Sequence, residues 1–137
     1  MSLDSLKQSD VKVGDQLPEL VVPLTTSLIV SGAIASRDFT PVHHDKAAAQ
    51  ASGVPDVFMN ILTTNGLVNR YVTDWAGPNA SVRNVQIKLG TPNTPGDDMT
   101  FNGSVTSKEG DEVTVELAGK NAWGDHVTAS VRLALPA

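Results

Sequence analysis

The chain has 137 residues, of which 40% are hydrophobic and 18% charged, and this composition predicts a single globular domain over residues 1–137. The net charge is -5 and no stretch concentrates lysine and arginine, so we expect no nucleic-acid partner, which would need a basic face. Cysteine is absent, which excludes disulfides and fits a reducing cytoplasm, where we expect the protein. No apolar run approaches the ~20 residues of a membrane span, and the N-terminus has no signal-peptide pattern, so we expect no membrane association.

The first third of the chain predicts one short strand and two helices. A strand is expected over residues 17–23, bounded by prolines. Apolar residues at helical spacing then predict a helix over about residues 28–36, preceded by hydroxyl side chains suited to capping. The segment 37–45 breaks this pattern and is predicted to be a loop, stiffened by Pro41. An alanine-rich helix is expected over residues 46–52 and closed by Gly53.

The longest helix is predicted from Phe58 to Trp75, because its apolar residues lie mostly three or four positions apart. Asp56 is a candidate N-cap, and Asn60, near the start, is also interpreted as a capping residue. Gly66 weakens the helix, and we expect it to allow close packing. The aromatic side chains on this helix are interpreted as core residues.

The second half of the chain predicts four strands, centred on residues 85–89, 99–105, 113–117 and 127–135, each alternating apolar and polar side chains. Turn signals at Gly110 and Gly124 predict that the last three strands form an antiparallel meander. A long helix beside an antiparallel sheet is an α+β layer arrangement. We predict a hotdog fold, in which the sheet wraps around the central helix, although other α+β sheets share this pattern.

One loop carries the residues best suited to catalysis. Asp38 and His43 lie five residues apart in the segment Arg37-Asp38-Phe39-Thr40-Pro41-Val42-His43. A carboxylate and a neutral imidazole can hold one water between them and move its protons. Spacing alone leaves a solvated or capping role open for both residues.

The run His43-His44-Asp45 raises a second possibility, a metal site. Adjacent loop side chains usually diverge, and a metal needs three or four converging ligands. The remaining histidine, His126, is far along the chain. We therefore expect no metal and no other cofactor.

The motif Asp38-x-x-Pro41-Val42-His43 resembles that of the MaoC-like, or (R)-specific, enoyl-CoA hydratases, in both its spacing and its place before the central helix. Thr40 stands where that family has asparagine, and Met59-Asn60 where it tends to have His-Gly. The resemblance implies a hydro-lyase that adds water to a 2-enoyl-CoA, with Asp38 and His43 as the catalytic pair. It also implies that backbone N–H groups near the start of the central helix, at Val57, Phe58, Met59 and Asn60, bind the thioester carbonyl.

Within this family the chain is most similar to the small subunits of bacterial steroid side-chain enoyl-CoA hydratases. The strings that carry this resemblance are Phe58-x-Asn60-Ile61-Leu62-Thr63, Arg70-Tyr71-Val72-Thr73-Asp74-Trp75 and Gly124-Asp125-His126-Val127-Thr128-Ala129. The resemblance implies an acyl-CoA substrate, for which it suggests a steroid side chain while a simpler acyl chain stays open. It also implies a partner subunit with a second MaoC-like domain; a homodimer stays open. The alternatives are a non-catalytic acyl-CoA-binding subunit and a hotdog thioesterase. A thioesterase of this fold usually has an acidic residue on the central helix, where Asp74 is the only one.

Overall fold

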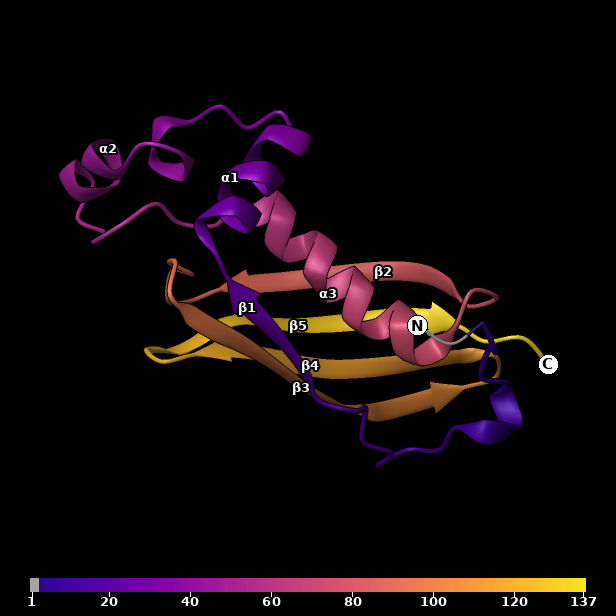
Figure 1. Ribbon diagram of the computed structural model, residues 1–137. Helices are drawn as coiled ribbons and strands as arrows, with labels where there is room; N and C mark the ends of the chain where they lie inside the picture. The colour runs from indigo at the N-terminus through magenta and orange to yellow at the C-terminus, as the bar shows by residue number, and fades with distance from the viewer. Residues whose placement is uncertain (1–2) are drawn as a thin grey trace.

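Five antiparallel strands form one sheet in the computed structural model, which describes residues 3–137 (Figure 1). In chain order the strands are β1 (Leu20–Leu24), β2 (Ser81–Leu89), β3 (Asp97–Glu109), β4 (Glu112–Asn121) and β5 (Gly124–Ala134). Their order across the sheet is β1-β3-β4-β5-β2, so β1 and β2 are the edges. The meander of β3, β4 and β5 is confirmed, with neighbouring strands antiparallel throughout.

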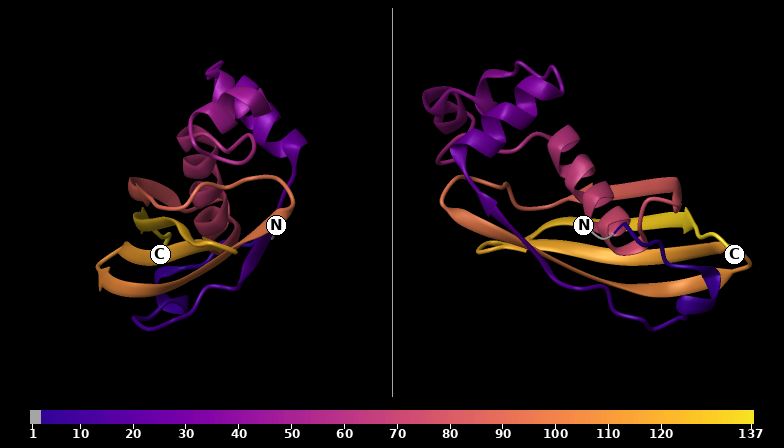
Figure 2. Two further views of the ribbon diagram at one scale, coloured as in Figure 1. Left: turned by 90° about the vertical axis from the view of Figure 1, so that its left-hand side faces the viewer. Right: turned by 45° about the vertical axis from the view of Figure 1, so that its right-hand side comes forward.

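The α-helices are α1 (Thr26–Ala35), α2 (Lys46–Ala51) and α3 (Ile61–Ala76), and two single 3₁₀ turns lie at Gln8–Asp10 and Pro41–His43. Helix α3 lies across one face of the sheet, while α1 and α2 gather at one end of α3 (Figures 1 and 2). This arrangement is the predicted hotdog fold. No helix within residues 3–137 is long and apolar enough to cross a membrane.

The alternating side chains of the sheet place its apolar face against α3. Tyr71 of α3 stacks on Phe101 of β3 with ring centroids 5.2 Å apart, and Leu117 of β4 lies opposite Gly103 on the same face. Val131 of β5 is fully buried in the same core. Since burying an aliphatic side chain contributes about 1.5–3 kcal/mol, this face fixes α3 on the sheet.

Helix α3 begins at Ile61, three residues later than predicted, and its N-cap is Asn60. The side chain of Asn60 accepts a hydrogen bond from the backbone N–H of Thr63 at 3.1 Å, which confirms its capping role. Asp56 is not the cap, because its carboxylate accepts from the N–H of Val57 instead. The apolar pattern continued through residues 57–59, but these lie outside the helix, in the segment that leads into it.

Candidate functional site

The end of α1 sets the position of Asp38. The N–H of Arg37 donates to the carbonyl of Ile34 at 3.0 Å, and that of Asp38 donates to the carbonyl of Ala33 at 2.9 Å. These two bonds close the helix in a Schellman motif, which needs a left-handed residue after the cap. Arg37 takes that conformation, with φ at 59°, although glycine is the usual residue there. The backbone of Asp38 is thereby fixed to the last turn of α1.

The loop brings Asp38 and His43 together. Residues Pro41–His43 form one 3₁₀ turn, which returns the chain so that Nε2 of His43 lies 3.2 Å from Oδ2 of Asp38. The side chain of His43 is 9% exposed and that of Asp38 24%. Solvent or a small reactant can therefore reach the carboxylate, while the imidazole is nearly enclosed.

The hydrogen bonds of His43 define its neutral tautomer. Its Nδ1 lies 2.6 Å from the carbonyl oxygen of Phe58, and since a carbonyl only accepts, Nδ1 carries the proton. In the neutral ring Nε2 is then an acceptor, and it faces the carboxylate of Asp38. In the neutral ring the two acceptors need a shared donor, such as a water that bonds to both, whereas in the imidazolium Nε2–H donates directly to Oδ2.

The carboxylate of Asp38 is held in its ionised form by donors. Oδ1 accepts from the hydroxyl of Thr40 at 2.7 Å and from its N–H at 3.2 Å, and Oδ2 accepts from Nδ2 of Asn60 at 3.2 Å. The pKa of Asp38 is lowered below the ordinary 3.8, mainly by the hydroxyl of Thr40, then by its N–H and then by Asn60. The positive charge of an imidazolium at His43 adds a smaller effect in the same direction. Asp38 is therefore ionised at neutral pH.

Only part of the predicted carbonyl-binding segment has N–H groups available for a substrate. The N–H of Val57 donates to Asp56, that of Phe58 to the carbonyl of Val42, and that of Met59 to the carbonyl of Asn93. The N–H of Asn60 has no acceptor within the described chain, and neither do those of Ile61 and Leu62 in the first turn of α3. The N–H groups that a carbonyl could use are thus at Asn60 and just after it.

The other residues of the loop have structural roles or none. Asp45 caps α2 by accepting from the N–H groups of Ala47 and Ala48, and His44 is exposed.

The third histidine, His126, lies far from the loop in sequence. It is buried on β5, where its Nδ1 donates to the carbonyl of Thr91 and its Nε2 accepts from the hydroxyl of Thr64 at 2.8 Å. In the part of the chain that the structure describes, no group of three or more metal-ligating side chains comes together.

A groove of about 340 Å³ runs between α1 and α3 beside the candidate site, and glycine, alanine and leucine line much of it. Four large apolar side chains near it are more than half exposed: Ile34, Phe39, Ile61 and Leu62. They come from the end of α1, the loop of residues 37–45 and the start of α3. The apolar surface around Asp38 is therefore open on this side of the chain.

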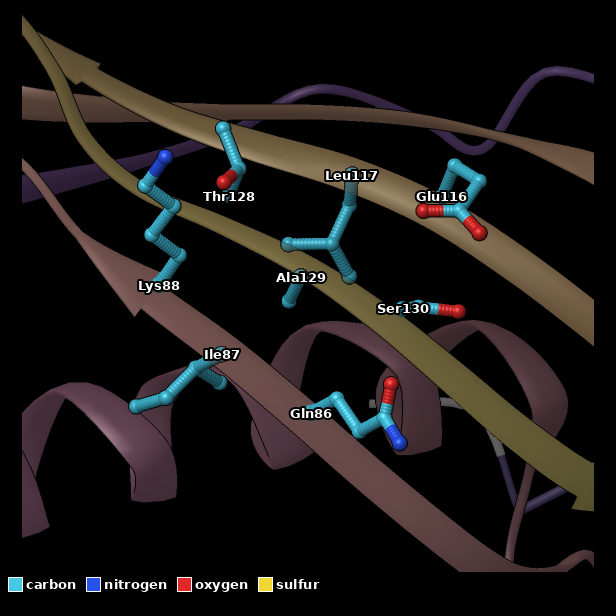
Figure 3. A pocket seen from close by; sticks show the side chains of 8 residues that line it. All are labelled: Gln86, Ile87, Lys88, Glu116, Leu117, Thr128, Ala129 and Ser130. Atoms are coloured by element: carbon cyan, nitrogen blue, oxygen red, sulfur yellow. The ribbon is translucent and has the colours of Figure 1, made fainter.

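A second hollow of about 340 Å³ lies over the sheet strands β2, β4 and β5 (Figure 3). Its polar lining, which includes Lys88, Glu116, Thr128 and Ser130, comes from strand positions that alternate with the buried core residues. It contains none of the predicted site residues.

Sequence reasoning missed the side chains that hold Asp38 in place. Thr40 follows Asp38 by two residues, the spacing at which an aspartate commonly accepts from the backbone, so a signal was present. Asn60 and Ser36 are 22 and 2 residues from Asp38 and meet at the crossing of α1 and α3. No local sequence pattern predicts that these side chains come into contact.

A family model described as MaoC like domain matches residues 11–126. The chain therefore belongs to the MaoC-like domain family. It is 50% identical over 123 residues, covering 90% of this chain and 95% of the other, to the 3-oxo-4,17-pregnadiene-20-carboxyl-CoA hydratase beta subunit of Mycobacterium tuberculosis. This confirms the resemblance to steroid side-chain hydratase subunits.

Solved structures agree with this assignment. The chain matches one in the ChsH1–ChsH2 complex of Mycobacterium tuberculosis with a TM-score of 0.89 at 49% identity, covering 90% of this chain and 98% of that one. It also matches the unliganded R-hydratase PhaJ1 of Pseudomonas aeruginosa with a TM-score of 0.88, covering 96% and 86% of the two chains. At 19% identity, the second match supports the hotdog fold alone.

Proposed function

We propose that this protein is a hydro-lyase that adds water to the double bond of a 2-enoyl-CoA, with Asp38 and His43 as the catalytic pair. The observation that carries the proposal is the 3.2 Å approach of Nε2 of His43 to the ionised carboxylate of Asp38. Support for the substrate class comes from the 50% identical relative, which is described as a 3-oxo-4,17-pregnadiene-20-carboxyl-CoA hydratase beta subunit. We therefore propose a CoA thioester with a bulky, steroid-like acyl group.

The hydrogen bonds give the two residues different tasks. A water beside the pair donates one O–H to Oδ2 of Asp38 and the other to Nε2 of His43. As its oxygen bonds to the β-carbon, one proton passes to Nε2, and the resulting imidazolium delivers it to the α-carbon on the same face. Asp38 stays ionised, orients the water and stabilises the imidazolium. Oxygen and both hydrogens of the water end in the product, and no electrons leave, so no redox cofactor takes part.

The thioester carbonyl gains negative charge as water attacks, and the start of α3 can stabilise that charge. The N–H groups of Asn60, Ile61 and Leu62 have no acceptor in the described structure, and the dipole of a 16-residue helix adds positive potential there. Of the four residues expected to bind the carbonyl, only Asn60 therefore keeps that role. Ile61 and Leu62, in the first turn of the helix, join it. Val57, Phe58 and Met59 position the segment through their own bonded N–H groups.

The position of the one acidic residue on α3 argues against a thioesterase activity. Asp74 lies near the C-terminal end of the helix and pairs with Nε of Arg70 at 3.3 Å, away from the N-terminal end that meets Asp38. A non-catalytic acyl-CoA-binding subunit is the other alternative. Purified protein given a 2-enoyl-CoA distinguishes the three. Loss of the conjugated-thioester absorbance without free thiol supports hydration, free thiol supports a thioesterase, and binding without either change supports a non-catalytic subunit.

We also propose that this chain works with a second MaoC-like hotdog subunit. The four exposed apolar side chains beside Asp38 and the adjacent groove leave the acyl group uncovered on one side, and the related complex has two different subunits named in its description. Strand β2 is also an unpaired edge, which favours association. Light scattering at micromolar concentration should show at least a homodimer, and co-expression with a MaoC-like partner should raise the hydration rate. A fully active monomer would contradict this proposal.

A further inference from the structure

Asn60 uses every hydrogen-bonding atom of its side chain. Its Oδ1 accepts from the N–H and the hydroxyl of Thr63, while Nδ2 donates to Oγ of Ser36 at 2.8 Å and to Oδ2 of Asp38 at 3.2 Å. Only 2% of the residue is exposed. A single buried amide therefore joins the first turn of α3, the end of α1 and the candidate catalytic carboxylate.

The donors and acceptors around this amide fix its orientation. The hydroxyl of Ser36 donates to the carbonyl of Gly32 at 2.7 Å, so its oxygen is free to accept from Nδ2 of Asn60. Turning the amide over would set its oxygen against the carboxylate of Asp38 and its NH₂ against the N–H of Thr63. Both contacts would become repulsive, so one orientation is strongly preferred.

We propose that Asn60 is the positioning residue of the reaction: its amide fixes the carboxylate oxygen of Asp38 that faces His43 and the reacting water. This inference rests on the proposed role of Asp38. It concerns the side chain of Asn60, whereas the carbonyl-binding role above uses its backbone N–H. Serine or aspartate would cap α3 as well as asparagine does. Neither supplies an amide N–H to Asp38, so capping alone does not account for asparagine here.

Two substitutions separate positioning from capping. Asn60→Ser keeps a capping oxygen and removes the amide N–H that reaches Asp38. Asn60→Asp keeps the cap and its size but places a second carboxylate beside the first. Thr25→Ala is the matched control, because it removes the N-cap of α1, which accepts from Leu28, without touching Asp38.

The measurements are kcat and kcat/KM for a 2-enoyl-CoA across pH in the active assembly, with carbon-detected NMR titration of the Asp38 carboxyl in the isolated chain. Both Asn60 variants should lower kcat by about tenfold or more, because small displacements of a reacting group are costly. They should also move the acidic limb of the profile to higher pH, and Asn60→Asp should move it further, since adjacent carboxylates share a proton. His43 is the titratable side chain in contact with Asp38, and neither variant removes it.

Two outcomes overturn this inference. One is a wild-type rate and acidic limb in both variants while Asp38→Asn abolishes hydration; the proposed function would then stand without the positioning role. The other is a loss that Thr25→Ala matches in rate and in pH dependence, which would reduce Asn60 to a cap. If Asp38→Asn keeps full activity, the proposed function fails instead, and the NMR titration still decides whether Asn60 governs the Asp38 carboxyl.

Discussion

Gly32 of α1 lies directly against Thr63 of α3: a Cβ atom built on the glycine would stand 2.2 Å from Oγ1 of the threonine. The two helices therefore pack too closely at this point for any side chain larger than that of glycine. The crossing matters because Thr63 donates to Asn60, and Ser36, one turn after Gly32, accepts from the same amide. The spacing of α1 and α3 thus controls the geometry around Asp38.

The substitution Gly32→Ala is expected to destabilise the protein by about 1–3 kcal/mol, the usual cost of overpacking. It should also lower hydration, because α1 has to move away from α3. Chemical denaturation gives the free energy of unfolding. In a Thr63→Ala background the obstructing hydroxyl is absent, so the same substitution should cost clearly less. An equal cost in both backgrounds would contradict the close contact.

Gly66→Ala should have the opposite effect on the isolated chain. Outside its own helix, no atom of residues 3–137 lies within 4 Å of a Cβ built there, so the close packing expected from the sequence is absent within the described chain. Alanine should raise the free energy of unfolding by about 0.5–1 kcal/mol. Because Gly66 lines the groove between α1 and α3, the same variant tests the proposed subunit contact. Unchanged affinity for a partner would show that the partner does not occupy the groove.

Thr40→Val should shift the pH dependence of hydration. The hydroxyl of Thr40 is the largest contributor to the lowered pKa of Asp38, so its loss raises that pKa. If Asp38 works ionised, the acidic limb of kcat/KM then moves to higher pH. Because the pKa of Asp38 is lower in the folded protein than the ordinary 3.8, ionised Asp38 stabilises the fold above about pH 3.8. This stabilisation is lost as the pH falls through the lowered pKa. Thr40→Asn keeps a donor and is the control; a shift of equal size there would contradict this account.

Asp38→Asn and His43→Ala should each lower hydration at least ~100-fold, the low end for loss of a general acid or base. His44→Ala should change the hydration rate little, because the side chain of His44 is exposed. The adjacent Asp45 caps α2, so it does not form a site together with His44. Circular dichroism should confirm folding of all three variants. Equal losses for the two histidine variants would point to a shared ligand role and call for metal analysis.

His126 should make stability depend on pH. Its burial lowers its pKa below the ordinary 6.5, so the folded protein keeps it neutral while the unfolded chain binds a proton. The free energy of unfolding should therefore fall as pH drops below about 6.5, by up to about 1.4 kcal/mol per pH unit. His126→Gln should flatten this slope. Parallel stability curves for the two proteins would show that the histidine carries no such penalty.

The sequence predicted the layers of the fold and singled out Asp38 and His43, which the structure brings within 3.2 Å of each other, but it did not predict the contacts that orient them. The strands and the long helix could be predicted because buried residues recur every two residues in a strand and every 3.6 residues in a helix. The start of α3 was placed too early because the apolar residues just before it, of which Val57 and Met59 are buried, extend the pattern beyond the helix. The bond from Asn60 to Asp38 spans 22 residues and depends on how α1 crosses α3, which no local pattern encodes.

All the side-chain hydrogen bonds described for Asp38, His43 and Asn60 join residues between Ser36 and Thr63. The geometry around Asp38 is therefore set mostly by one continuous stretch of chain, while the sheet supplies a platform for it. If the proposed function holds, selectivity for the acyl group could be altered by exchanging the partner subunit that faces the open apolar surface, without changing this stretch. For protein engineering, this separates two design problems: the stretch from α1 to the first turn of α3 is kept intact, and variation is confined to the surface that covers the acyl group.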